Sequence, residues 1–108
     1  MPTTSKIADA FTTNVTGEVH TMAFGGVFVA DIHWYAGTFT ATLEMSLDGD
    51  NWLPFIGQDG TALTANISTS LKSARWELLG QPQQLFRVSI TSASSASGRY
   101  AYGRTAAN

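Results

Sequence analysis

The stretch Phe39-Thr-Ala-Thr-Leu-Glu-Met-Ser-Leu47 decides the fold class, because apolar and polar residues alternate through it without a break. Successive side chains of a β-strand point to opposite faces, so this pattern predicts a strand with one buried and one exposed face. Asp48-Gly49 follows directly, and Asp-Gly is a strong signal for a β-hairpin. We therefore expect Leu47 to end the strand facing inward and Trp52 to return over the core.

Four other segments of the chain repeat this alternation, and they predict further half-buried strands. Val27–Tyr35 differs because both of its faces are partly apolar, which indicates a central strand or one whose outer face meets a partner. The residues expected to face inward are Phe28, Ala30, Ile32, Trp34, Leu63, Ala65, Ile67, Ala74, Trp76, Leu78, Phe86, Val88, Ile90, Tyr100 and Tyr102.

Turn residues separate the alternating segments, and no helical period is sustained. Ala36-Gly37 predicts a turn before the long strand, and the small residues of Ser92–Gly98 predict a loop. Short strands with frequent turns are typical of an all-β fold. We expect an antiparallel β-sandwich or jelly roll of about seven to eight strands.

The expected division of the chain has three parts. Residues 1–26 are rich in Thr, Asn and Gly with scattered apolar residues, and they suit either edge strands near 11–15 and 19–24 or an extended N-terminal arm. Residues 27–104 form the β-sandwich domain, and residues 105–108 form a loose tail.

Composition fits a protein-binding domain and fits equally an ordinary small β domain, because such domains are often rich in Thr and Ser. The length of 108 residues suits one domain. Charged residues are only 13%, so the surface is built from small polar residues, whose desolvation and ordering at an interface cost little free energy. Residues 1–71 carry one cation and seven acids, net −6, whereas residues 72–108 carry five cations and one acid, net +4. If the two halves do not interleave in space, acidic and basic patches would favour head-to-tail contacts.

The same numbers argue against several other classes. The pI of about 5.4, without a basic cluster interleaved with aromatics, argues against nucleic-acid binding. The chain has no cysteine, which excludes disulfides and thiolate metal sites. No segment approaches the length of a membrane span, and Met1–Ala10 lacks the features of a signal peptide, so we expect a soluble protein.

Residues with catalytic or ligand chemistry are few and lack supporting motifs. His20 and His33 are the only histidines, and no nucleophile elbow accompanies them. Glu44 could be one of a pair of carboxylates for glycoside hydrolysis, but it lies on the polar face of a regular strand, which favours a structural role. Oxygen ligands for Ca²⁺ would come from Asp48, Asp50, Asn51 and Asp59, but the first three are also the residues that a hairpin turn needs. We therefore expect no enzyme, no metal site and no cofactor. Tyr35 is the best exposed aromatic for stacking on a sugar.

One set of motifs resembles small virion proteins of tailed phages, of the capsid decoration or cement type. It comprises Gly37-Thr-Phe39 and its strand, Ser46-Leu-Asp-Gly-Asp-Asn-Trp52, Asp59-Gly-Thr-Ala-Leu63, and the late strand Leu85–Ile90. The resemblance spans residues 37–102. It implies a β-sandwich or jelly-roll protein of the virion that has no catalytic residues.

The resemblance also implies partners and a location. A cement protein binds the assembled shell and not its free subunit, so the expected partners are the major capsid protein and further copies of this chain, as a dimer or trimer on the capsid surface. It would be made in the host cytoplasm. Tail, baseplate, adhesin and carbohydrate-binding modules remain alternatives. The expected contact residues are Val27, Val29, Asp31, His33 and Tyr35, with Arg75 and Arg87 as polar anchors, and residues 1–26 would reach a neighbour.

Overall fold

Eight antiparallel strands form a single hydrogen-bonded sheet in the computed structural model, which describes residues 4–22, 26–57 and 60–106. The all-β antiparallel prediction is therefore confirmed. No helix that could span a membrane occurs in these three ranges. The strands are β1 (Thr4–Phe11), β2 (Val15–Thr16), β3 (His20–Thr21), β4 (Gly26–Ser46), β5 (Leu53–Pro54), β6 (Thr64–Ile67), β7 (Ser73–Gly80) and β8 (Leu85–Ala106).

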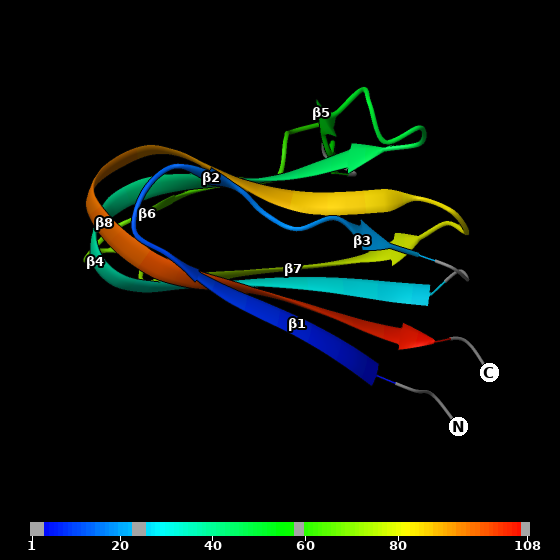
Figure 1. Cartoon of the computed structure of the whole chain (residues 1–108), viewed down its shortest axis with the longest axis horizontal. Helices are drawn as coiled ribbons and strands as arrows, with labels where there is room; N and C mark the ends of the chain where they lie inside the picture. The colour runs from blue at the N-terminus through cyan, green and yellow to red at the C-terminus, as the bar shows by residue number, and fades with distance from the viewer. Residues whose placement is uncertain (1–3, 23–25, 58–59, 107–108) are drawn as a thin grey trace.

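Two long strands organise the molecule. β4 and β8 pair along their whole length, from Gly26↔Ala106 to Ser46↔Leu85, and both bend near the middle, so that the sheet folds over itself into two layers (Figure 1). The lower layer has the order β1, second half of β8, first half of β4, β7. The upper layer places β2 and β3 beside the first half of β8, and β5 and β6 beside the second half of β4.

The predictions of a turn at Ala36-Gly37 and a loop at Ser92–Gly98 are wrong, because both segments lie inside the long strands at the bend. The ladder shifts register three times between Trp34 and Thr40, as bulges do when they bend a strand. Gly37 has a φ of +71°, and a Cβ there would overlap the Ser95 carbonyl oxygen. Small residues are thus required where the strands cross closely at the corner, and local sequence cannot distinguish such a corner from a loop.

The core lies between the two layers and is built from the inward residues of the alternating strands. Phe28 of the lower layer stacks on Phe86 of the upper layer with ring centroids 4.5 Å apart. The inward-facing residues predicted for the strands from Phe28 to Tyr102 are all buried or packed against the buried cluster, with the exception of Leu47, so this part of the prediction is otherwise confirmed. The first half of β4 pairs with β7 on one side and β8 on the other, as expected for a central strand.

Two buried tyrosines of β8 join the layers by hydrogen bonds. The Tyr102 hydroxyl accepts from the Val88 backbone N–H at 2.8 Å, and the Tyr100 hydroxyl accepts from the Glu18 N–H at 3.0 Å. Burial raises the pKa of Tyr102 well above its usual range. Gly17 fits beneath these rings, since a Cβ there would lie 2.7 Å from the Tyr102 hydroxyl oxygen.

The N-terminal segment pairs with β8 at every described strand. β1 runs alongside β8 from Thr4↔Thr105 to Phe11↔Gly98, and β2 and β3 pair with its first half. The Phe11 ring meets that of Phe39 edge-on at 5.0 Å. Residues 23–25, within the second expected edge strand, lie outside the described residues. Of the expected tail, 105–106 belong to β8 and 107–108 lie outside the described residues.

Candidate interaction surface

Four of the expected contact residues lie together on the outer face of the lower layer. Val27, Val29, Asp31 and His33 alternate along β4, flanked by β7 and β8. Val27, Val29 and His33 are half-buried and Asp31 is buried, because the neighbouring strands cover their sides. Tyr35 lies at the bend with 55% of its surface exposed. We refer to Val27, Val29, Asp31, His33 and Tyr35 as the strip. Most of this face is covered by neighbouring strands and does not project from the molecule.

A bidentate ion pair joins Asp31 to Arg75 of β7. Arg75 Nε and Nη2 donate to the two carboxylate oxygens at 2.6 and 3.0 Å, and Arg75 Nη1 lies 3.8 Å from Glu77. The hydrogen bonds and charge of Asp31 raise the pKa of Arg75. Asp31 is 12% exposed at its side chain and Arg75 is 62% exposed. Arg75 therefore secures a nearly buried carboxylate, and one side of its guanidinium remains available to another group.

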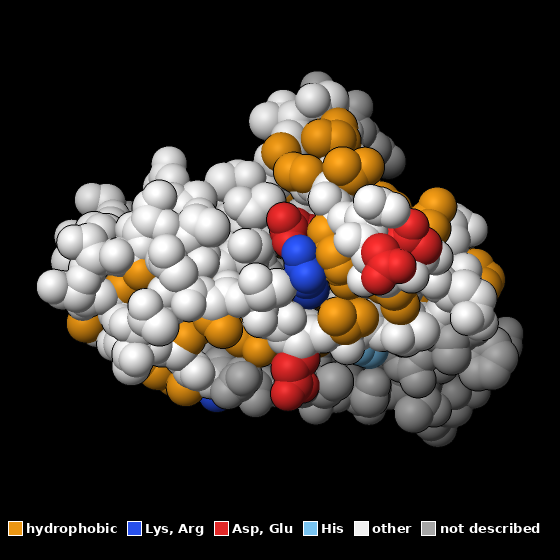
Figure 2. Space-filling model, turned by 45° about the horizontal axis from the view of Figure 1, so that its top comes forward, with side chains coloured by type: hydrophobic (Ala, Val, Ile, Leu, Met, Phe, Trp, Pro, Cys, Tyr) orange, Lys and Arg blue, Asp and Glu red, His pale blue; other side chains and the backbone are white. Residues whose placement is uncertain are grey.

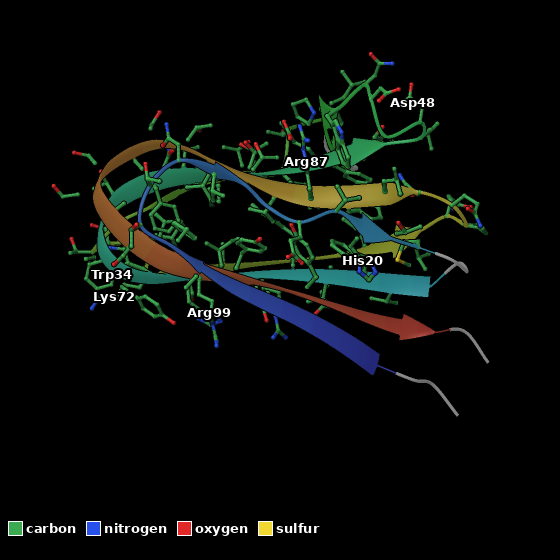
Figure 3. All side chains as sticks on the ribbon, in the orientation of Figure 1. His20, Trp34, Asp48, Lys72, Arg87 and Arg99 are labelled. Carbon is green, nitrogen blue, oxygen red and sulfur yellow. The ribbon has the colours of Figure 1, made fainter. Side chains whose placement is uncertain are left out.

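Arg87 lies apart from the other candidates, on the upper layer (Figure 3). Its Nε donates to Glu44 at 2.8 Å, and its guanidinium lies 4.1 Å from the ring centre of Trp52. Trp52 was expected to cover the core, and that prediction is wrong, because the ring packs on this outward-facing arginine. Six of the seven predicted contact residues therefore lie on the lower layer or at its bend, and the seventh does not join them.

A shallow polar depression of about 530 Å³ adjoins the strip. Asp31, His33, Arg75 and Arg99 contribute its charged and imidazole groups. The Nε atom of Arg99 is buried and has no hydrogen-bond partner among the described residues. The charge of Arg75 is already neutralised by Asp31. Arg99 is therefore the arginine of this depression that can donate a further hydrogen bond to a ligand.

A second surface, which the sequence analysis missed, surrounds β5. Four apolar side chains there are strongly exposed: Leu47 at 75%, Leu53 at 65%, Ile56 at 55% and Leu79 at 72%. We refer to these four residues as the β5 surface. Figure 2 shows hydrophobic side chains gathered on and below the projection that this part of the chain forms. Apolar residues exposed in a group, as opposed to singly, are typical of protein-contact sites.

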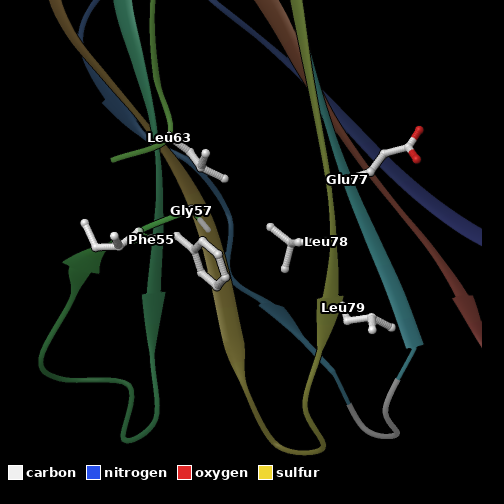
Figure 4. A pocket seen from close by; sticks show the side chains of 7 residues that line it. Phe55, Gly57, Leu63, Glu77, Leu78 and Leu79 are labelled. Atoms are coloured by element: carbon white, nitrogen blue, oxygen red, sulfur yellow. The ribbon is translucent and has the colours of Figure 1, made fainter. Parts of the chain in front are cut away.

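Each of two hollows is lined by two members of the β5 surface. An open groove of about 780 Å³ lies between Ile56 and Leu79, with Phe55, Leu63 and Leu78 on its walls (Figure 4). A smaller hollow of about 200 Å³ has both Leu47 and Leu53 on its rim. The combination of exposed leucines and apolar hollows suits the side chains of another protein.

The turn after β4 explains why Leu47 is exposed and not inward as expected. β4 ends at Ser46, whose hydroxyl accepts from the Gly49 N–H at 2.9 Å and so turns the chain early. Asp48 accepts from the backbone N–H groups of Asp50 and Asn51, both at 2.9 Å. These hydrogen bonds hold the pKa of Asp48 well below its usual range.

The same contacts explain the acidic residues of this turn, whose oxygen atoms could also serve as calcium ligands. The second oxygen of Asp48 accepts from the Asn51 side-chain amide at 2.7 Å, so both of its oxygens serve the turn. Asp59 lies outside the described residues. Within the ranges that the structure covers, no three His, Asp or Glu side chains are grouped as metal ligands would be.

The sequence did contain signals for the β5 surface. Leu53-Pro-Phe-Ile56 is an apolar run between two turns, and Leu78-Leu79 breaks the alternation by placing a leucine on the outward face of β7.

No family model matches this chain, and no curated protein matches it in sequence. Solved structures do match. The crystal structure of the SPBc2 prophage-derived protein YomS is similar with a TM-score of 0.80 and 9% identity, covering 98% of this chain and 96% of that one. A Bacillus endospore appendage protein, from a family of disulfide-linked pili, is similar with a TM-score of 0.55 and 14% identity, covering 96% and 86%. These similarities establish a shared fold.

Proposed function

We propose that this chain is a structural protein of a phage particle that binds the assembled capsid and stabilises it. The observation that carries the proposal is the β5 surface, an exposed apolar contact face on a fold shared with a prophage-derived protein. A protein that binds the assembled shell but not its free subunits shifts the equilibrium toward the shell by mass action. The location that follows is the outer surface of the virion.

The β5 surface is better suited to docking than the strip on β4. Ile56 lies beside the open groove and Leu53 beside the smaller hollow, and both are exposed, whereas Val27 and Val29 are half-buried between neighbouring strands. Burial of exposed leucines against a partner removes apolar area from water at about 25 cal/mol per Å². The strip and Arg75 remain predicted contacts for a second partner surface.

Contact between copies is the second part of the proposal. The appendage protein of similar fold belongs to disulfide-linked pili. This chain has no cysteine, so its copies would have to associate without disulfides. Its low charge content keeps the desolvation cost of such contacts small.

The test is co-sedimentation of the purified chain with assembled shells of the phage that encodes it, and with the free capsid subunit. We expect the chain to pellet with shells and not to bind the free subunit. Leu53→Ser with Ile56→Ser should abolish pelleting, whereas Leu71→Ser, at an exposed leucine outside the β5 surface, should not. Equal binding by both variants would refute the docking face. Failure to bind shells, with binding to glycans that changes Trp fluorescence, would favour a carbohydrate-binding module.

A further inference from the structure

We propose that the free edge of β7 pairs with β7 of a second copy about a two-fold axis centred on Trp76. This interface would provide the contact between copies of the chain on which the second part of the proposed function rests. It can be tested without any shell, so its failure is distinguishable from failure of capsid binding.

β7 has an unpaired edge. It pairs with β4 from Gly26↔Gly80 to His33↔Ser73, and no other strand among the described residues is bonded to it. The Lys72 carbonyl accepts from the Trp34 N–H at 2.8 Å, on the β4 side. Because backbone groups alternate in an antiparallel ladder, the N–H and C=O groups that point to the free edge are those of Ser73, Arg75, Glu77 and Leu79.

This edge lacks the usual protection against pairing. Its ladder with β4 runs through eight residues without a register shift, and the strand contains no proline. Edge strands are usually protected by bulges, prolines, inward-pointing charges or charged side chains, above all lysine, and β7 contains no lysine. β7 carries one charge of each sign, Arg75 and Glu77, and such a pair can attract a second copy of itself.

The charges select one register. A two-fold axis perpendicular to the layer keeps the inward faces of both copies on one side, so inward residues must lie opposite inward residues. An axis centred on Arg75 or on Glu77 would place like charges opposite each other. An axis centred on Trp76 places Arg75 opposite Glu77 of the second copy, twice. It is the two-fold register in which both charges find opposite partners.

Side chains agree with this register. Arg75 uses Nε and Nη2 for Asp31, and its Nη1 lies 3.8 Å from Glu77 of the same chain, too far for a hydrogen bond, so Nη1 can donate to a carboxylate of the second copy. Leu78 would lie opposite Ala74, and Leu79 opposite Ser73, so each leucine would meet a small residue. The two Trp76 side chains would lie opposite each other at the axis. Leu79, 72% exposed, and the β7 wall of the 780 Å³ groove would lie at the interface. Closed two-fold dimers are also the commonest form of soluble oligomer.

A cysteine experiment tests the register, because the chain has no cysteine of its own. Ser73→Cys and Leu79→Cys proteins, both altered at exposed positions, are mixed and oxidised. We expect a disulfide-linked heterodimer in the mixture and no linked dimer from either protein alone, because each new cysteine faces the other site. Linkage at equal yield in all three samples, or in none, would overturn the register.

Charge reversal tests the interface in solution. Light scattering of the unaltered chain should show a dimer that dissociates on dilution. Glu77→Lys should raise the dissociation constant roughly tenfold or more, because two attractive pairs become repulsive. Glu18→Lys makes the same charge change in the β2–β3 connection and should leave the dimer intact. Thermal unfolding of each variant at low concentration checks that the monomer is folded. A monomer at all concentrations, or equal effects of the two reversals, would overturn the proposal.

Discussion

Replacement of Tyr102 by Phe isolates the contact that joins the two layers. The Tyr102 hydroxyl accepts a 2.8 Å hydrogen bond from the Val88 N–H, and Tyr102 and Val88 are 1% and 0% exposed. The phenylalanine ring fits the same space, so the change removes one hydrogen bond and leaves a buried donor without its partner. An unsatisfied buried donor costs about 1–3 kcal/mol.

That cost converts into a measurable shift in unfolding. For a domain of this length, about 2 kcal/mol lowers the melting temperature by roughly 10 °C. Urea unfolding followed by Trp fluorescence gives the free energy directly. Tyr35→Phe is the control, because Tyr35 is 55% exposed and its change should stay within about 0.5 kcal/mol. If Tyr102→Phe were as stable as the control, the hydroxyl would not join the layers.

The same residue predicts an alkaline effect. The folded-state pKa of Tyr102 is raised by burial, so the neutral phenol stabilises the fold below the unfolded-state pKa of about 10, and this stability is lost as the pH rises above it. Tyr102→Phe should therefore flatten the decline in stability above pH 10. An unchanged decline would mean that another group causes it.

Three further predictions concern other parts of the fold. Gly17→Ala should lower the melting temperature in calorimetry, because the new methyl would lie 2.7 Å from the Tyr102 hydroxyl; an unchanged value would mean that this segment does not pack on the core. Asp48→Asn should reduce the loss of stability in urea between pH 5 and pH 2, because the depressed pKa of Asp48 contributes stability above about pH 4 that is lost on acidification; a steeper loss would contradict this. Arg75→Lys should destabilise the chain in thermal unfolding, since lysine cannot form the bidentate contact with Asp31, and full stability would refute that role.

The strands and the core could be predicted from sequence because alternation is a local property. Phe39, Ala41 and Leu43 are buried as their spacing requires, and so are Phe86, Val88 and Ile90. The corners could not be predicted, because Gly37 and Ser92–Gly98 carry the residues of turns, and only the pairing of β4 with β8 makes them strand.

The interaction surface was less predictable for a different physical reason. Asp31 and Arg75 are 44 residues apart, and only the β4–β7 register brings them together. Leu47 is exposed because a serine hydroxyl ends its strand one residue early. Which edges of a sheet stay unpaired depends on pairing between residues far apart in the sequence, and a short window of sequence does not encode it.

The pairing of β8 with both β1 and β4 constrains how the nascent chain can fold. In the lower layer, residues 98–106 lie between β1 and the first half of β4, although these two strands leave the ribosome long before them. Contacts so far apart along the chain give a high contact order and slow folding. The lower layer therefore cannot close until residues 98–106 have left the ribosome, and a premature stop near residue 98 would delete an interior strand of the layer.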